Sequence, residues 1–158
     1  MSFRAMAETE CAAVAALIQE LAIALGGKTV PKLDAARLAA IAFGSAPLVD
    51  STVAVRGNSI VGACLALLTY STWRGETGLY VVDLFVSTKE RGRGIGENLL
   101  RTSARRGQAR GATFIKLEVD DTNTAATRFY GRLGFARNDH DRTFALESDN
   151  LARFAAET

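Results

Sequence analysis

Residues Val81–Leu100 read VVDLFVSTKERGRGIGENLL, and this stretch decides the fold. Its apolar beginning is typical of a buried strand, and a helix is expected over Glu97–Ala109. Between them, Gly92, Gly94 and Gly96 let the backbone approach a ligand closely, where a Cβ atom would obstruct it. A strand that enters a helix through such a turn leaves backbone N–H groups and the helix dipole free to bind an anion. The segment therefore predicts a phosphate-binding loop.

Two common phosphate-binding patterns do not fit the sequence. The Rossmann fingerprint G-x-G-x-x-G needs a third glycine where Glu97 stands. A Walker A loop ending in Gly27-Lys28-Thr29 would need a glycine at Ala22, and a helix rather than a strand is expected before it. Neither a dinucleotide-binding nor a P-loop fold is expected.

Length and composition limit the class of protein. The 158 residues correspond to a single domain over residues 1–158. With 48% hydrophobic and 23% charged residues, neither disorder nor a membrane protein is expected, and a net charge of +2 does not favour nucleic acid as a partner. The longest apolar stretch, residues 11–25, is interrupted by Gln19 and Glu20 and lacks a basic flank. We therefore expect no signal peptide and no membrane span, and a cytoplasmic location.

The cysteines and the histidine exclude the common metal sites. Cys11 and Cys64 lie far apart without zinc-ligand spacing, and His140 is the only histidine. The two thiols are expected to be buried and reduced, and no metal is expected. His140, between Asp139 and Asp141, is expected to be a turn residue.

The remaining pattern predicts one mixed α/β sheet. Arg56–Ser59 is expected to be a turn between antiparallel strands, and Gly26-Gly27, Gly44 and Gly134 are expected to end helices. The expected strands are Ser2–Ala5, Leu48–Val55, Ile60–Tyr70, Leu79–Val86, Phe114–Val119 and a last one that begins at Phe144–Leu146. The expected helices are Glu8–Leu25, Leu33–Phe43, Glu97–Ala109, Asn123–Leu133 and a short C-terminal one.

Three segments together resemble a known family. Arg91–Gly96, with the pattern R-x-x-G-x-G, resembles the pyrophosphate loop of the GCN5-related N-acetyltransferase (GNAT) superfamily, which binds acetyl-coenzyme A. The preceding Asp83–Val86 is similar to the acetyl-binding strand of that family. Residues 123–135, NTAATRFYGRLGF, are similar to its N-x-x-A-x-x-F-Y-x-x-x-G-F signature, at a family-like distance. The resemblance covers nearly the whole chain.

The resemblance implies a fold, an activity and a set of site residues. The fold would be a single GNAT domain with a splayed, mostly antiparallel central sheet between helices. The activity would be transfer of an acetyl group to a primary amine by direct attack in a ternary complex. Tyr130 would protonate the departing thiolate, and the backbone of Leu84, Phe85 and Val86 would hold the acetyl carbonyl. The implied coenzyme-binding residues are Leu84, Phe85, Val86, Arg91, Gly92, Arg93, Gly94, Ile95, Gly96, Glu97, Asn123 and Ala126.

A narrower resemblance concerns the acceptor amine. IQELA, TYSTWRG and ESDNLARFAAE look like segments of the diamine (spermidine/spermine) and thialysine N-acetyltransferase branch. Val82, however, stands where that branch has a glutamate that assists amine deprotonation, and Ser71 stands where it has an aspartate. By elimination, Asp83 is expected to be the base, and a monoamine or amino-acid-like amine is expected to be preferred over a polyamine.

Several residues keep a second interpretation. Strand alternation places Asp83 on the opposite face from Val82 and Leu84, where it would meet either the substrate or a buried salt-bridge partner. Trp73 and Glu76 would either bind the acceptor or belong to an exposed connection. Asn123 is also suited to cap the following helix, and without the family pattern Tyr130 would be assigned to the core.

Three function classes remain open at this point. Besides the enzyme, the chain could be a catalytically idle acyl-coenzyme A sensor or a nucleic-acid-associating module. The arginine-rich helix is the basis of the last class, but no aromatic stacking positions lie among its arginines. These arginines would either rim the adenosine 3′-phosphate or form a solvated helix face: Arg101, Arg105, Arg106 and Arg110. A homodimer through the C-terminal segment is consistent with the resemblance.

Overall fold

The computed structural model describes residues 1–24, 26, 30–140 and 143–156 of the chain. They form two compact units, Met1–Asp120 and Asp121–Thr158. That both belong to one domain stays a prediction from the chain length.

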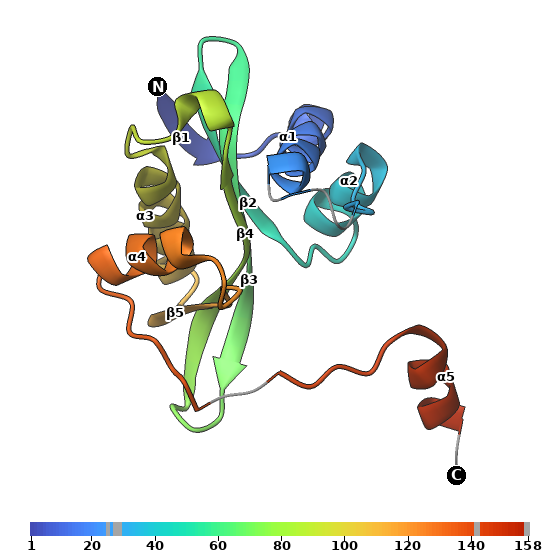
Figure 1. Cartoon of the computed structure of the whole chain (residues 1–158). Helices are drawn as coiled ribbons and strands as arrows, with labels where there is room; N and C mark the ends of the chain where they lie inside the picture. The colour runs from blue at the N-terminus through green and yellow to red at the C-terminus, as the bar shows by residue number, and fades with distance from the viewer. Residues whose placement is uncertain (25, 27–29, 141–142, 157–158) are drawn as a thin grey trace. The chain divides into compact units, whose positions relative to one another are not determined.

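The first unit contains a five-stranded sheet in the order β1-β2-β3-β4-β5 (Figure 1). Strands β1 to β4 are antiparallel neighbours, and β5 runs parallel to β4, so the predicted mixed α/β sheet is confirmed. The β2–β3 hairpin closes on the pair Arg56–Ser59, where Gly57 has the positive φ of +57° that such a tight turn requires. The strands are β1 (Ser2–Ala5), β2 (Asp50–Arg56), β3 (Ser59–Ser71), β4 (Glu76–Val86) and β5 (Phe114–Leu117).

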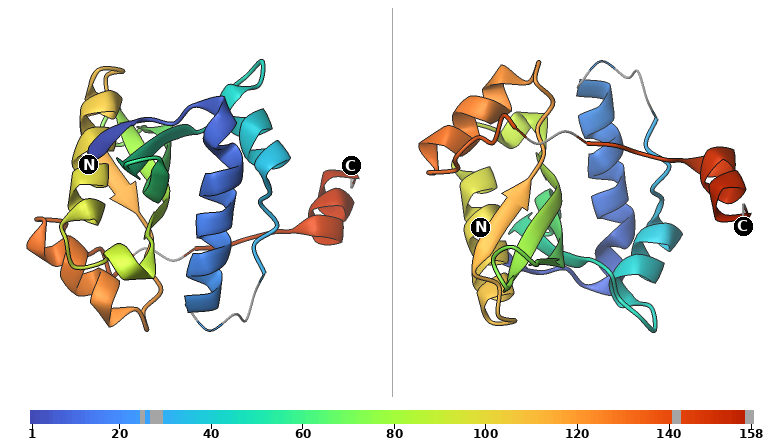
Figure 2. Two further views of the ribbon diagram at one scale, coloured as in Figure 1. Left: turned by 90° about the horizontal axis from the view of Figure 1, so that it is seen from above. Right: turned by 90° about the horizontal axis from the view of Figure 1, so that it is seen from below.

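Helices cover both faces of this sheet. Figure 1 and both views of Figure 2 show α1 (Cys11–Ala24) and α2 (Ala35–Phe43) on one face and α3 (Ile95–Gln108) on the other. Two short 3₁₀ turns, Glu8–Glu10 and Thr88–Glu90, precede α1 and the glycine loop. The Asp34 side chain caps α2 by accepting a hydrogen bond from the backbone of Arg37 at 2.8 Å.

Each face of the sheet has its own core. On the α1/α2 face, Val14, Ile18 and Leu38 pack with Leu65 and Phe85 of the central strands. On the α3 face, Leu99 lies so close to Gly62 that a Cβ atom there would be 3.1 Å from its Cδ1 and 2.9 Å from the Phe85 carbonyl oxygen. These two cores assign each residue of β4 to a face, which matters for the site below.

The second unit holds α4 (Thr124–Arg132) and α5 (Ser148–Ala156). The strand expected to begin at Phe144–Leu146 was predicted wrongly, because residues 143–147 have no regular structure and the Phe144 side chain is 93% exposed. Apolar alternation yields a strand only where a neighbouring strand satisfies its backbone hydrogen bonds.

Helix α1 is described as far as Ala24, and the expected end at Leu25 is therefore not tested. Leu25 and Gly27, the latter part of the expected helix stop, lie outside the described residues. Among the helices that the structure describes, none has the length and apolar character needed to cross a bilayer.

Candidate active site

The central strand β4 is irregular at Val82. Across the β3–β4 pair, Asp83 lies opposite Leu65 and Val81 lies opposite Ala66, so Val82 is an extra residue in β4, a β-bulge. The sequence predicts that successive side chains of this strand point to opposite faces of the sheet. The bulge interrupts that alternation at Val82. Because Leu65 belongs to the α1/α2 core, Asp83 lies on that face, whereas Val82 is 46% exposed.

The environment of Asp83 is unusual for a carboxylate. Its side chain is half-buried, and this burial raises the pKa of the carboxyl above its ordinary value. Within the described part of the chain, Asp83 has neither an ion-pair partner nor a hydrogen bond. The alternative of a buried salt bridge is therefore not realised among these residues, and the Asp83 carboxylate is available to a ligand.

Two residues that the sequence did not single out continue from Asp83: Tyr80 is its neighbour on the sheet, and Glu118 interacts with Tyr80. Tyr80 pairs with Leu67, so Tyr80 and Asp83 occupy adjacent positions on the same face of the sheet. The Tyr80 phenol interacts electrostatically with Glu118, the residue that follows β5. Burial, Glu118 and Asp83, in that order, raise the pKa of the Tyr80 phenol. The one sequence signal for Glu118 is a lone carboxylate at the carboxyl end of a strand, where α/β sheets often bind ligands.

The glycine loop has the geometry of an anion site. Gly92 and Gly94 have φ values of +77° and +73°, a left-handed backbone that residues with a Cβ rarely adopt. Gly94 is the N-cap of α3 and brings no side chain to its first turn, so the backbone N–H groups of that turn are open to an external acceptor. Open space surrounds the Cβ position of Gly92. The loop therefore fits the pyrophosphate of a coenzyme.

The side chains of the loop are partly engaged by the protein itself. The Arg91 Nε donates to the Val86 carbonyl at 3.1 Å, which ties the loop to the end of β4. Arg93 and Arg56 flank the Glu90 carboxylate at 3.4 and 3.0 Å. These contacts hold the loop in place before any ligand binds.

The arginines of α3, and Arg110 just after its end, also have partners. Arg101 forms an ion pair with Glu97 at 2.7 Å, and Arg106 and Arg110 both meet the Asp50 carboxylate. Much of the positive charge that the sequence places on this helix is therefore neutralised by neighbouring acids. Glu97 itself faces Arg101, so its remaining contribution to an anion site is its backbone N–H.

Trp73 and Glu76 are not brought beside Asp83. Trp73 lies in the β3–β4 turn with its side chain 100% exposed, and Glu76 begins β4, where it accepts a hydrogen bond from Thr113 at 2.8 Å. Ser71 accepts a hydrogen bond from the backbone of Arg74 at 3.3 Å in the same turn. At the rise of an extended strand, seven residues separate Glu76 from Asp83 by roughly 20 Å.

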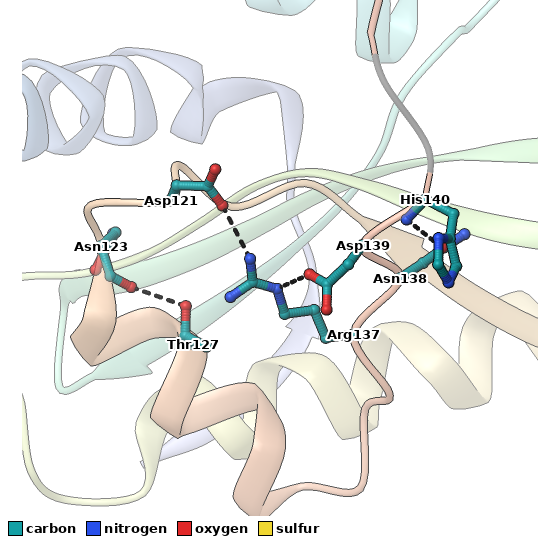
Figure 3. Close-up of polar contacts among 7 residues, drawn as sticks. All are labelled: Asp121, Asn123, Thr127, Arg137, Asn138, Asp139 and His140. Atoms are coloured by element: carbon teal, nitrogen blue, oxygen red, sulfur yellow. Dashed lines mark hydrogen bonds and ion pairs between the residues drawn. The ribbon is translucent and has the colours of Figure 1, made fainter.

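The second unit carries the other sequence-predicted residues. Asn123 is the N-cap of α4, as one interpretation expected, and its side chain accepts from the backbone N–H of Ala126 at 3.0 Å. Figure 3 shows Asn123 joined to Thr127, whose hydroxyl donates to the Asn123 backbone carbonyl at 3.2 Å. Asn123 thus uses both its side chain and its backbone to start the helix.

The Tyr130 ring is held at the end of α4. It makes edge-to-face contacts with Phe129 and Phe135, at ring-centroid distances of 5.1 and 5.4 Å. The backbone N–H of Phe135 donates to the Tyr130 carbonyl at 3.1 Å, and Gly134 with φ +89° allows the chain to turn back. The aromatic contacts fix the ring plane and therefore the direction of the hydroxyl.

His140 lies in an irregular segment after α4 (Figure 3), in agreement with the turn that was expected there. Its backbone N–H donates to the Asn138 side chain at 3.0 Å, and Arg137 joins Asp121 to Asp139. Asp141 lies outside the described residues. No group of three or more His, Cys, Asp or Glu side chains suited to a metal ion occurs in the described part of the chain.

Known proteins share both the sequence pattern and the fold. Residues 14–135 match the Acetyltransferase (GNAT) family. The thialysine N-epsilon-acetyltransferase of Bos taurus is 31% identical over 135 residues, which cover 80% of this chain and 79% of that protein.

Two solved structures are similar in fold. An integron cassette protein from the mobile metagenome of V. cholerae has a TM-score of 0.82 at 21% identity, over 99% of this chain and 98% of that one. An aminoglycoside acetyltransferase from an uncultured soil metagenomic sample, solved with sisomicin, has a TM-score of 0.77 at 18% identity, over 94% and 96% of the two chains. The family match spans the bulged strand, the glycine loop and Tyr130, and the chain therefore belongs to the GNAT family as an acetyl-coenzyme A-dependent N-acetyltransferase.

Proposed function

We propose that this protein acetylates a primary amine of a small molecule by direct attack of the amine within a ternary complex. One observation supports the proposal most strongly: the half-buried Asp83 carboxylate forms no ion pair or hydrogen bond with the described residues. Asp83 also immediately precedes Leu84–Val86, the segment that leads into the glycine loop. An unpaired carboxylate costs stability in such a position, and a cationic ligand would offset that cost. Relatives that act on thialysine and on aminoglycosides support an amine acceptor.

Acetyl-coenzyme A would supply the activated acetyl group, and two segments would bind it. The first turn of α3, with Gly92 and Gly94 before it, would hold the pyrophosphate through backbone N–H groups. The backbone of Leu84, Phe85 and Val86 would orient the acetyl carbonyl and stabilise the charge that develops on its oxygen. The remaining proposed coenzyme-binding residues are Arg91, Arg93, Ile95, Gly96, Glu97, Asn123 and Ala126.

Proton transfer would involve Asp83 and Tyr130. An alkyl amine with a pKa of about 10.4 is almost entirely protonated at pH 7, so a base is needed to free its lone pair. Asp83 would accept that proton, and its raised pKa makes the protonated form easier to reach. Tyr130, with its ring fixed by Phe129 and Phe135, would protonate the departing thiolate.

The acceptor would carry a single reacting amine rather than a polyamine chain. Val82 and Ser71 bring no negative charge to positions where the polyamine branch has carboxylates. Trp73 and Glu76 would reach only the far end of a long acceptor, because they lie at the opposite end of β4. A monoamine or amino-acid-like amine fits this arrangement.

Location and assembly belong to the same proposal. Cys11 and Cys64 are free buried thiols, which supports a reducing compartment such as the cytoplasm. The C-terminal segment exposes Phe144, Leu151 and Phe154, which supports its use in a homodimer. Removal of residues 143–158 should then reduce the mass measured by light scattering from that of a dimer to that of a monomer.

A panel of amines tests the function directly. Thiol release from acetyl-coenzyme A would be followed with lysine, thialysine, spermidine, simple monoamines and an aminoglycoside. Turnover with at least one primary amine is expected. Binding of acetyl-coenzyme A without turnover on any amine would support the idle sensor instead, and binding of nucleic acid without protection by the coenzyme would support the third class.

A further inference from the structure

Tyr80 lies between two carboxylates on one face of the sheet. The Val82 bulge brings Asp83 opposite Leu65, while Tyr80 is opposite Leu67, so the two are neighbours on the α1/α2 face. Without the bulge, strand alternation would place them on opposite faces. Two strand positions correspond to roughly 7 Å, a gap that a phenol and one water can span.

Glu118 reaches the same face from the next strand. In the parallel β4–β5 pair, Tyr80 is opposite Lys116 and Val81 is opposite Leu117. Glu118 follows two residues after Lys116, so strand alternation puts it on the face of Lys116 and Tyr80. The electrostatic interaction of Glu118 with Tyr80 agrees with this placement. Glu118 is exposed, whereas Asp83 is half-buried, so the three groups lead from the interior to solvent.

We propose that Tyr80 and Glu118 form the path by which the proton of the acceptor amine leaves Asp83 for solvent. This inference rests on the proposed amine acetylation. It assigns Tyr80 and Glu118 a role in the reaction through Asp83, so they are positioning and relay residues rather than groups that touch the reacting atoms.

The relay balances in protons and electrons. The ammonium group of the acceptor loses one proton to the Asp83 carboxylate, and the freed lone pair forms the new C–N bond. The O–H bond of protonated Asp83 then breaks as its proton passes to the Tyr80 oxygen, directly or through one water. In the same movement the original Tyr80 O–H bond breaks, and that proton goes to the Glu118 carboxylate. Glu118 releases it to water, and each acetylation yields one proton.

The charges around the relay favour this direction. On the same face, Asp83 and Glu118 are the acidic neighbours of Tyr80, and Lys116 is the basic one, opposite Tyr80 on β5. From α1, Glu20 is engaged by Ser87 and Thr88 at the far end of β4. Burial disfavours the charged form of Asp83, so Asp83 accepts a proton readily, whereas Glu118 is exposed and lies where water can take the proton up.

The test uses Glu118→Gln and Tyr80→Phe in the full chain, with Glu8→Gln as the matched control. Glu8 is an exposed glutamate in the turn before α1, so its substitution removes the same charge elsewhere. Thialysine serves as the probe amine, and kcat/KM is measured from pH 6 to pH 10 at saturating acetyl-coenzyme A. Coenzyme affinity and Tm are measured for every variant.

Both relay variants should lower kcat/KM for thialysine by roughly 10- to 100-fold near pH 7, less than the ~10²- to 10⁴-fold effect of losing a group that exchanges a proton with the substrate itself, because Asp83 is retained. The loss should shrink towards pH 10, where the amine enters unprotonated. The double variant should be no slower than either single one, because both break the same path. Added imidazole should restore part of the activity of Glu118→Gln by carrying the proton instead. Coenzyme affinity should not change.

The outcomes separate this inference from the proposed function. Wild-type turnover with an unchanged kcat/KM in Glu118→Gln overturns the relay and leaves the proposed function intact. A loss that is equal at every pH and insensitive to imidazole also overturns it, because a purely structural role would behave in that way. A wild-type protein that binds acetyl-coenzyme A but acetylates neither thialysine nor any other amine overturns both.

Discussion

Glu20 of α1 accepts a hydrogen bond from the backbone N–H of Thr88 at 3.0 Å, across 68 residues of sequence. The hydroxyl groups of Thr88 and Ser87 donate to the same carboxylate at 2.9 and 3.1 Å. These hydrogen bonds, the backbone one foremost, lower the pKa of Glu20. The contact ties a helix on one face of the sheet to the turn that opens the glycine loop, so α1 helps to position the proposed coenzyme site.

Glu20→Ala should therefore weaken acetyl-coenzyme A binding. The loop would lose its anchor at Thr88, and imprecise placement of the backbone N–H groups should raise the Kd by up to about tenfold. Isothermal titration calorimetry measures this directly. Glu20→Gln, which keeps an acceptor oxygen for the Thr88 N–H, should bind nearly as well as the wild type, and an equal loss in both variants would contradict the anchoring role.

The same carboxylate predicts a pH dependence of coenzyme binding. Because the folded-state pKa of Glu20 lies below its ordinary value of about 4.3, its stabilising contribution is complete above that value and is lost as the pH falls through the lowered pKa. The contribution of Glu20 to the Kd of acetyl-coenzyme A should therefore be constant between pH 6 and 8 and should be lost only as the pH falls below the ordinary carboxyl value. A Glu20-dependent change within that interval would be inconsistent with the observed hydrogen bonds.

Gly94→Val should abolish coenzyme binding while the chain stays folded. A β-branched side chain strains the backbone at φ +73° and obstructs the first turn of α3. Gly57→Val is the matched control, since Gly57 has a similar φ of +57° but lies in the β2–β3 turn. Both should lower Tm, and only Gly94→Val should lose coenzyme-induced thermal protection. Full protection of the Gly94 variant would argue against the loop assignment.

Tyr130→Phe should lower kcat by roughly 10²- to 10⁴-fold, as removal of a general acid does. The ring contacts with Phe129 and Phe135 would be retained, so neither coenzyme affinity nor Tm should change much. Tyr70→Phe removes a phenol from an exposed residue of β3 and should leave kcat unchanged. Wild-type turnover of Tyr130→Phe would show that the acid lies elsewhere.

Asp83→Asn should slow turnover and at the same time raise Tm at neutral pH. A carboxyl whose folded-state pKa is raised binds its proton more tightly when folded, so the folded state loses stability as the pH rises above the ordinary carboxyl pKa of about 3.9. The neutral amide removes that cost but cannot accept a proton. Differential scanning fluorimetry at pH 4 and pH 8 should show a larger gain at pH 8. A lower Tm at both values would indicate a structural partner instead.

Val82→Glu should raise activity on diamines relative to monoamines. Val82 is exposed beside Asp83, and an added carboxylate there would attract a second ammonium group by on the order of 1 kcal/mol. The kcat/KM for spermidine should rise by about fivefold, and the pH optimum should move downward. Val30→Glu is the control, because it adds the same negative charge at another exposed valine. A low micromolar KM for spermidine in the wild type would contradict the expected monoamine preference.

Much of the fold and of the coenzyme loop follows from local sequence. Helices α1 to α4 and the five strands appear close to where apolar periodicity predicts them, because periodicity and glycine positions act within a few residues. The left-handed conformations of Gly92 and Gly94 follow from residue type in the same way. Phe144–Leu146 shows the limit, since an apolar alternation has no strand structure without a neighbouring strand.

The face on which Asp83 lies was decided by tertiary structure alone. The Val82 bulge depends on how β3 and β4 pair, and pairing is a contact between distant residues that strand alternation in one segment does not reveal. The same holds for Glu118 beside Tyr80 and for Glu20 at Thr88, which chain order separates and the sheet brings together. Sequence alone thus specified the loop that we propose to bind phosphate, because its chemistry is backbone geometry set by neighbouring residues. The placement of Tyr80 and Glu118 near Asp83 was decided only by the tertiary structure, because it depends on the register in which β3, β4 and β5 pair.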